Sequence, residues 1–211
     1  MKTDFNNLKK NAIETAVALM AVSARTAPKS KAKDNIEIIY FDGNDLNKAI
    51  KLMGSKKFRN ETVKHKEFFI DSDGQVLKEA EGVLAIGVKA KKALNLNCGK
   101  CGCKNCAEFT KAVSEGKDVN CAFKIMDLGF ATCSAARTAA ELNIDNRVMY
   151  DIGEAIKKLY MKDCDIVLGI ALSAKGHNIF FDRYLRFFVS RARKKKTSVD
   201  KILTEYGINI N

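Results

Sequence analysis

Residues 82–88 read GVLAIGV, an apolar run with the length of one β-strand. Two more runs of this kind stand at 36–41, which reads IEIIYF, and at 165–172, which reads DIVLGIAL. Each run is bounded by polar or turn-forming residues, as strands in a folded domain are. We therefore expect three buried strands in one central sheet.

Helical patterns separate these three runs. Apolar residues recur at helical spacing from Leu8 to Ala21, and Asp4 is a suitable N-cap, so we expect a helix over about 4–25. Strands that alternate with helices indicate an α/β or α+β domain, here of a three-layer kind with a central sheet. We assign residues 1–182 to this domain and 183–211 to a basic C-terminal helix or tail. Further helices are expected at 45–53, 75–80, 122–142 and 147–160, and short strands at 68–70 and 179–181.

Length and composition suit a soluble protein with a core of its own. The chain has 211 residues, of which 46% are hydrophobic and 29% are charged. No stretch approaches the roughly 20 apolar residues that a membrane span requires. We expect a cytoplasmic protein in which the seven cysteines are thiols or metal ligands and not disulfides.

The cysteine-rich segment 95–121 follows the run 82–88 and looks like an insertion between a strand and a helix. Its spacing is C-x2-C-x4-C-x14-C, and soft thiolates that converge on a compact inorganic core are what an iron–sulfur cluster requires. Gly99 and Gly102 let the loop curl with its backbone close to such a cluster. A short helix is expected over 107–115. The candidate cluster ligands are Cys98, Cys101, Cys106 and Cys121.

Other interpretations of the cysteines stay open. Structural zinc also takes four thiolates, usually from two C-x2-C pairs, whereas this segment has one such pair. Cys103 lies inside the loop as a spare thiol or as a substitute for a neighbouring ligand. Cys121 follows the third candidate ligand only after 14 residues, which is a long reach. Cys133 and Cys164 are expected to be small core residues.

The cysteine segment resembles a known iron–sulfur module. It is similar to the four-cysteine module of the corrinoid iron–sulfur protein and of the B subunit of the Rnf electron-transport complex, whose form is CGxCGxxxCxxF followed by a distant cysteine. This resemblance implies a low-potential [4Fe–4S] centre. The matching residues are Cys98, Gly99, Cys101, Gly102, Cys106 and Phe109, with Cys121 as the distant cysteine.

Nearly the whole chain resembles a family of uncharacterised prokaryotic ferredoxin domain-containing proteins, which has no assigned reaction. The surrounding domain is also similar to the flavin-binding nitroreductase fold, through Ala27-Pro28-Lys29-Ser30 and the helix that contains Asp127-Leu128-Gly129. This similarity implies FMN as a second cofactor, with its phosphate in reach of Arg25 and Lys29. Solvated surface charges explain these two side chains more simply. The stretches that match the ferredoxin domain-containing family are 20–36, 96–109, 121–150 and 165–183.

The formal net charge of +12 is concentrated near the C-terminus. Between Arg183 and Lys201 stand eight basic residues and one aspartate, interleaved with aromatic residues such as Phe187 and Phe188. A segment of this kind can bind nucleic acid, an anionic membrane or an acidic protein. A solvated helical face is the simpler interpretation.

Two functions therefore compete at the level of the sequence. The first is an iron–sulfur redox protein that passes single electrons to a partner protein or to a small-molecule substrate. The second is a nucleic-acid- or protein-binding module in which a cluster or a zinc ion only stabilises the structure. His177, in the polar loop 173–178, is a candidate for anion binding or proton donation, and His65 is expected at the surface. The sequence leaves open the oligomeric state, a homodimer included, and whether the protein is an enzyme.

Overall fold

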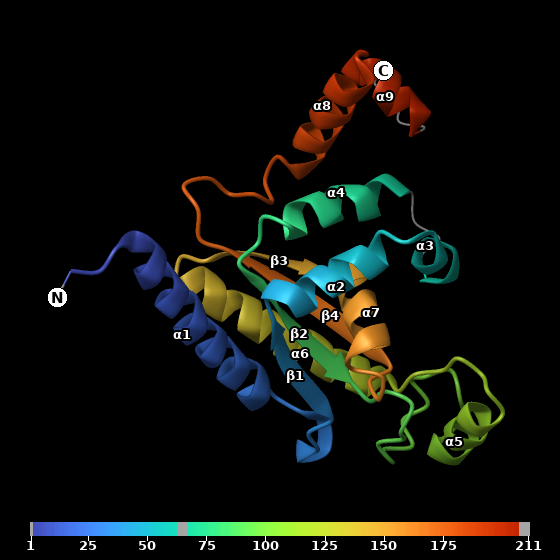
Figure 1. Cartoon of the computed structure of the whole chain (residues 1–211). Helices are drawn as coiled ribbons and strands as arrows, with labels where there is room; N and C mark the ends of the chain where they lie inside the picture. Colours follow the sequence, from blue (N-terminus) through green and yellow to red (C-terminus); the bar gives the residue numbers. More distant parts are fainter. Residues whose placement is uncertain (1, 63–66, 207–211) are drawn as a thin grey trace.

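Four antiparallel strands build the centre of the molecule in the order β1-β2-β4-β3 (Figure 1). The computed structural model describes residues 2–62 and 67–206. The central strand β2 pairs with β1 on one side and β4 on the other, and all of its residues are buried. The strands predicted at 36–41 and 82–88 are confirmed. The four strands are β1 (Ile36–Phe41), β2 (Gly82–Val88), β3 (Asp145–Met149) and β4 (Ile166–Ser173).

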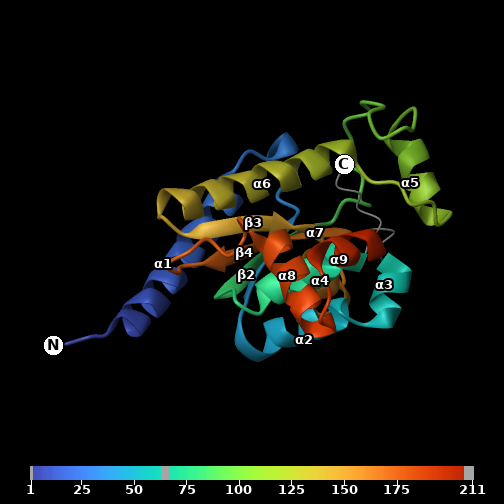
Figure 2. The ribbon, with the colours of Figure 1, turned by 90° about the horizontal axis from the view of Figure 1, so that it is seen from above.

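Helices cover both faces of this sheet and make three layers (Figures 1 and 2). Each face of the sheet has its own hydrophobic core. The side chains of β2 alternate between these two cores, because successive side chains of a strand point to opposite faces. Leu84 and Ile86 pack in the core under α1 and α6, whereas Val83 and Ala85 pack in the core under α2 and α7. The predicted mixed α/β architecture with a central sheet is confirmed. These covering helices are α1 (Phe5–Thr26), α2 (Gly43–Met53), α6 (Ala122–Glu141) and α7 (Tyr150–Leu159).

The remaining helices lie around these layers, and α3 and α4 contribute Phe58, Ile70, Val76 and Leu77 to the core under α2 and α7. α8 and α9 pack on each other through a small apolar cluster of their own, and α8 lies against α4 (Figure 1). In the part of the chain that the structure describes, no helix combines the length and the apolar character needed to cross a membrane. The bounds are η1 (Ser30–Ala32), α3 (Lys56–Thr62), α4 (Glu67–Leu77), α5 (Cys106–Ser114), α8 (Arg183–Lys195) and α9 (Val199–Glu205).

One predicted helix start and one predicted strand near the sheet are wrong because tertiary contacts override local patterns. The helix expected over 147–160 begins only at Tyr150, since residues 145–149 pair with β4 as an edge strand. Residues 179–181 form a turn and not a strand. Ile179 and Phe180 bury their side chains in the α2/α7 core from that turn.

Further expectations concern helix α4, two cysteines and His65. Residues 68–70 belong to helix α4 and not to a strand, and α4 ends at Leu77 instead of near Ala80. Cys164 is buried as expected, but Cys133 is exposed because it lies on the outer face of α6. The prediction for His65 lies outside the described residues.

Candidate iron–sulfur site

The candidate site begins with a loop after β2 that turns back on itself. Asn95, Asn97, Gly99 and Gly102 have left-handed backbone, with φ of 59°, 52°, 69° and 81°. Glycine adopts such angles without strain, and asparagine does so more readily than other side chains. A Cβ on Gly102 would meet no atom within 4 Å. The backbone angle therefore explains this glycine, and crowding within the chain does not.

Cys106 is the first residue of α5, and a reciprocal pair of hydrogen bonds holds it. The backbone N–H of Asn97 donates to Sγ of Cys106 at 3.3 Å, and the N–H of Cys106 donates to Oδ1 of Asn97 at 3.0 Å. Asn105 caps the helix, because its side chain accepts from the N–H of Glu108 at 2.9 Å. An N–H donor on a sulfur is the interaction that favours a thiolate ligand. Sequence reasoning missed Asn97, whose signal is an asparagine inside a cysteine loop.

Cys121 returns to this loop from the far side of α5. It is the N-cap of α6, it is buried, and its N–H donates to the carbonyl oxygen of Ala90 at 3.0 Å. Leu94, Phe109 and Cys121 form a small buried cluster, against which Cys101 and Cys103 pack. The 14-residue excursion thus brings Cys121 to the same cluster as Cys101.

The thiols share one loop but do not form a ready-made ligand cage. Within residues 2–62 and 67–206, no group of three or more His, Cys, Asp or Glu side chains is close enough to hold a metal ion. Cys98, Cys101 and Cys106 are half-buried. Burial and the neighbouring Cys101 raise the pKa of the Cys103 thiol. The donor set, five soft thiols within 24 residues, fits an iron–sulfur cluster chemically, and cluster binding must draw the thiols together.

Lys124 is a buried cation in the first turn of α6. Its side chain is 1% exposed, and its Nζ donates to the carbonyl oxygen of Lys89 at 2.9 Å and to Oδ1 of Asn35 at 3.0 Å. Burial lowers the pKa of Lys124. These bonds tie the helix end that carries Cys121 to the ends of β1 and β2. Sequence reasoning missed this residue, although a lysine within an apolar helix start was a signal.

Asp127, one turn further along α6, holds the segment before β1. Its Oδ1 accepts from the backbone N–H of Ser30 at 3.0 Å and from the Ser30 hydroxyl at 2.8 Å. Its Oδ2 is buried and finds no hydrogen-bond partner in the described part of the chain. The next residues, Lys31 and Ala32, have left-handed backbone with φ of 58° and 50°. Lys31 reaches the cysteine loop, where its Nζ donates to the carbonyl oxygen of Asn95 at 3.3 Å.

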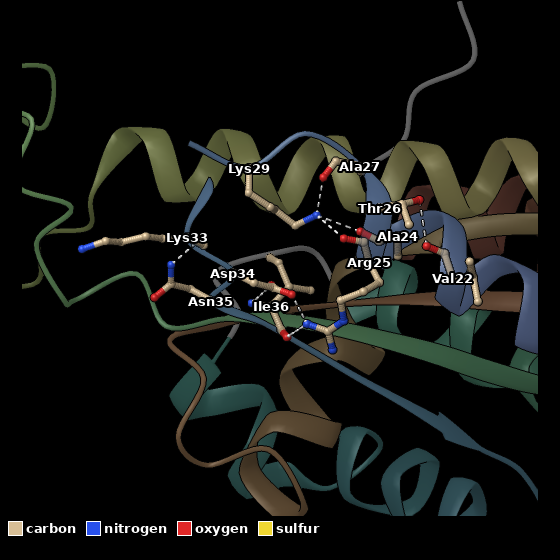
Figure 3. Close-up of polar contacts among 10 residues, drawn as sticks. All are labelled: Val22, Ala24, Arg25, Thr26, Ala27, Lys29, Lys33, Asp34, Asn35 and Ile36. Carbon is tan, nitrogen blue, oxygen red and sulfur yellow. Dashed lines mark hydrogen bonds and ion pairs between the residues drawn. The ribbon is translucent and has the colours of Figure 1, made fainter. Parts of the chain in front are cut away.

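Arg25 and Lys29 form hydrogen bonds around the C-terminal end of α1 (Figure 3). The Arg25 guanidinium pairs with the Asp34 carboxylate and donates to the carbonyl oxygen of Ile36 at 2.8 Å. The Lys29 ammonium donates to three carbonyl oxygens near the helix end, at distances from 2.6 to 3.1 Å. Both cations are engaged within the chain and do not point at an open anion site.

The basic C-terminal segment meets acidic partners on α4 and just after it. Three arginines of α8 form ion pairs, Arg183 with Asp73 at 3.2 Å, Arg186 with Glu79 at 3.1 Å and Arg191 with Asp71 at 3.8 Å. The aromatic rings that stand between these arginines in the sequence, Phe187 and Phe188, are buried in the α8/α9 cluster. The candidate residue His177, in contrast, is exposed in its loop and lies apart from the cysteine segment in the sequence.

Two comparisons with known proteins bear on the family. A curated "Uncharacterized protein" of Archaeoglobus fulgidus is 41% identical over 180 residues, which cover 84% of this chain and 95% of that protein. The family model described as "Uncharacterized protein containing a ferredoxin domain (DUF2148)" matches residues 117–183. The chain belongs to this ferredoxin-domain family. The stretch that matches the family model includes Cys121 and Lys124 but not the first three candidate ligands.

Solved structures share the fold of this family member. A nitroreductase with bound FMN from Desulfitobacterium hafniense matches with a TM-score of 0.51 and 11% identity over 84% of this chain and 80% of its own. An oxidoreductase containing FMN matches with a TM-score of 0.50 and 15% identity over 82% of this chain and 73% of its own. The chain therefore has the nitroreductase fold, with the cysteine segment between β2 and α6.

Proposed function

We propose that this protein is an iron–sulfur redox protein in which Cys98, Cys101, Cys106 and Cys121 hold a [4Fe–4S] cluster. The observation that carries the proposal is the return of Cys121 to the cysteine loop, where it shares a buried cluster with Cys101. A cysteine that is only a small core residue does not require a glycine-turned loop with further thiols beside it. When bound, such a cluster accepts and donates single electrons.

The chain supplies what a thiolate-bound cluster needs around it. Cys106 and Cys121 stand at the starts of α5 and α6, where the helix dipole favours negative charge. The Asn97 N–H already donates to one of the sulfurs. Phe109 and Leu94 keep water from one side of the loop, because both are buried. Burial and N–H donors to sulfur are the levers by which a protein sets the reduction potential of a cluster.

Anaerobic purification followed by iron, sulfide, zinc and flavin analysis of one sample tests the proposal. We expect about four iron and four sulfide per chain for this cluster type. Single Cys→Ser variants at the four ligand positions should lose most of the iron, whereas Cys133→Ser should keep it, because Cys133 lies exposed on α6. Zinc in place of iron, or full iron in all four ligand variants, would contradict the assignment. Loss of iron in Cys103→Ser would mean that this thiol takes the place of a neighbouring ligand.

FMN is the second cofactor to test, since the two neighbours in fold named above contain it. Arg25 and Lys29 are engaged at the end of α1, so a flavin phosphate has to find other donors in this chain. Flavin released on denaturing the sample, with its characteristic visible absorbance, would place a flavin beside the cluster in one redox protein. Its absence from a sample with full iron would leave the cluster alone as the cofactor.

A further inference from the structure

The surface around the cysteine loop carries an excess of lysine. From Lys89 to Lys117 the chain has seven lysines and two glutamates, and no aspartate. Lys31 joins this surface from η1 through its hydrogen bond to Asn95. Lys89, Lys91 and Lys92 line a shallow cavity of about 510 Å³ beside the same asparagine. We call this surface the lysine face.

The acidic groups near the lysine face are already engaged. Asp118 pairs with Lys91 at 3.2 Å, and Asp163 pairs with Lys89 at 3.8 Å. Asp165, which lines the same cavity, accepts from the backbone N–H of Lys91 at 2.8 Å. Glu115 pairs with two lysines, and Glu108 accepts from the backbone N–H of residue 104. Four exposed lysines remain that form no ion pair with the described part of the chain. They are Lys31, Lys92, Lys100 and Lys104.

The lysine face differs from the basic C-terminal segment in its position. Three arginines of α8 meet acidic partners on or next to α4, whereas Arg193, Lys194, Lys196 and Lys201 are exposed and form no ion pair with the described part of the chain. The free charge of the lysine face surrounds the proposed ligands, since Lys100 and Lys104 alternate with Cys98, Cys101 and Cys103.

We propose that the lysine face docks an acidic electron-transfer protein. Opposite charges across such a surface steer the encounter and orient the two proteins. The inference rests on the proposed function, because the partner exchanges one electron with the cluster, and no bond forms or breaks. Nucleic acid is the other polyanion to consider, but base stacking requires exposed aromatic rings. Phe109, the one aromatic residue between 89 and 121, is buried.

Binding of a purified acidic ferredoxin to the reconstituted holoprotein tests this docking surface. Calorimetric titration should show an affinity that falls steeply with added salt. The fourfold variant Lys31→Glu, Lys92→Glu, Lys100→Glu, Lys104→Glu should bind about tenfold more weakly or worse. The matched control reverses the same number of charges in the basic C-terminal segment, at Arg193, Lys194, Lys196 and Lys201, and should bind like the wild type.

Three outcomes separate the proposals. Equal binding by both variants, or a loss only in the C-terminal control, would overturn the docking surface. Tighter binding of a single-stranded RNA oligonucleotide that depends on the four lysines would replace the acidic protein by nucleic acid. Iron and sulfide are measured on every sample, so a chain that binds the ferredoxin without holding a cluster refutes the proposed function and not the docking surface.

Discussion

Replacing Gly153 by alanine tests how closely α7 packs on the sheet. A Cβ at this position would lie 2.1 Å from the carbonyl oxygen of Val167 and 3.0 Å from Cα of Leu168. Both atoms belong to the backbone of β4, which cannot turn aside as a flexible side chain can. α7 must therefore move away from the sheet, and Ile152 beside it must leave its place in the core.

The expected magnitude follows from two opposing effects. Overpacking a tight core costs about 1–3 kcal/mol, and a collision with backbone belongs at the upper end of that range. Alanine in place of glycine inside a helix returns about 1 kcal/mol. We expect Gly153→Ala to lower the free energy of unfolding by about 2 kcal/mol.

Gly129 in α6 is the matched control. A Cβ there would meet no atom within 4 Å, so Gly129→Ala should show only the helix preference and raise the free energy of unfolding by up to about 1 kcal/mol. Guanidinium denaturation of the cluster-free chain, followed by far-UV circular dichroism, measures both variants. The packing argument fails if Gly153→Ala is as stable as the wild type, or if both variants change in the same direction.

Three other perturbations test the site and its surroundings. Lys124→Met leaves the carbonyl oxygen of Lys89 without its donor, so the cluster-free chain should lose about 1–3 kcal/mol in denaturant unfolding. Burial raises the pKa of Asp73 from 3.8 to about 6 despite its ion pair. As the pH falls, the folded state therefore binds this proton before the unfolded state does. The free energy of unfolding of the wild type should therefore fall by up to about 3 kcal/mol relative to that of Asp73→Asn as the pH rises from about 4 to about 6. Denaturation of both proteins at the two ends of this pH range measures the change, and a constant difference between them would contradict the raised pKa. Asn97→Gly and Asn97→Ala both remove the acceptor of the Cys106 N–H, but only glycine keeps the left-handed φ of 52° without strain. Iron content after reconstitution should be higher in the glycine variant, and equal contents would mean that the loop conformation does not matter for cluster loading.

Local patterns predicted the strands that consist mainly of apolar residues. The runs 36–41 and 82–88 are strands at the predicted bounds. The fully buried β2 needs apolar side chains throughout, and in the half-buried edge strand β1 only Glu37 interrupts the apolar run. The edge strand β3 reads DNRVM and has no such run, so its neighbours in the sequence suggested a helix. Only its pairing with β4 makes it a strand.

The candidate site divides in the same way. Cys98, Cys101 and Cys106 stand close together in the sequence, and their spacing alone predicts a shared ligand role, which stays a prediction. The place of Cys121 depends on a hydrogen bond to Ala90 and on packing against Phe109, and no local pattern encodes either contact.

The sequence by itself determined the buried strands, the long helices and the cysteine set, because each depends on residues that are neighbours in the chain. The tertiary structure alone decided the rest, since those features depend on pairs of residues far apart. Arg183 and Asp73 are 110 residues apart in the sequence, yet their ion pair shows that the C-terminal charge is partly neutralised within the molecule. Unpaired positive charge also lies around the cysteine loop, where Lys31 meets Asn95 across 64 residues.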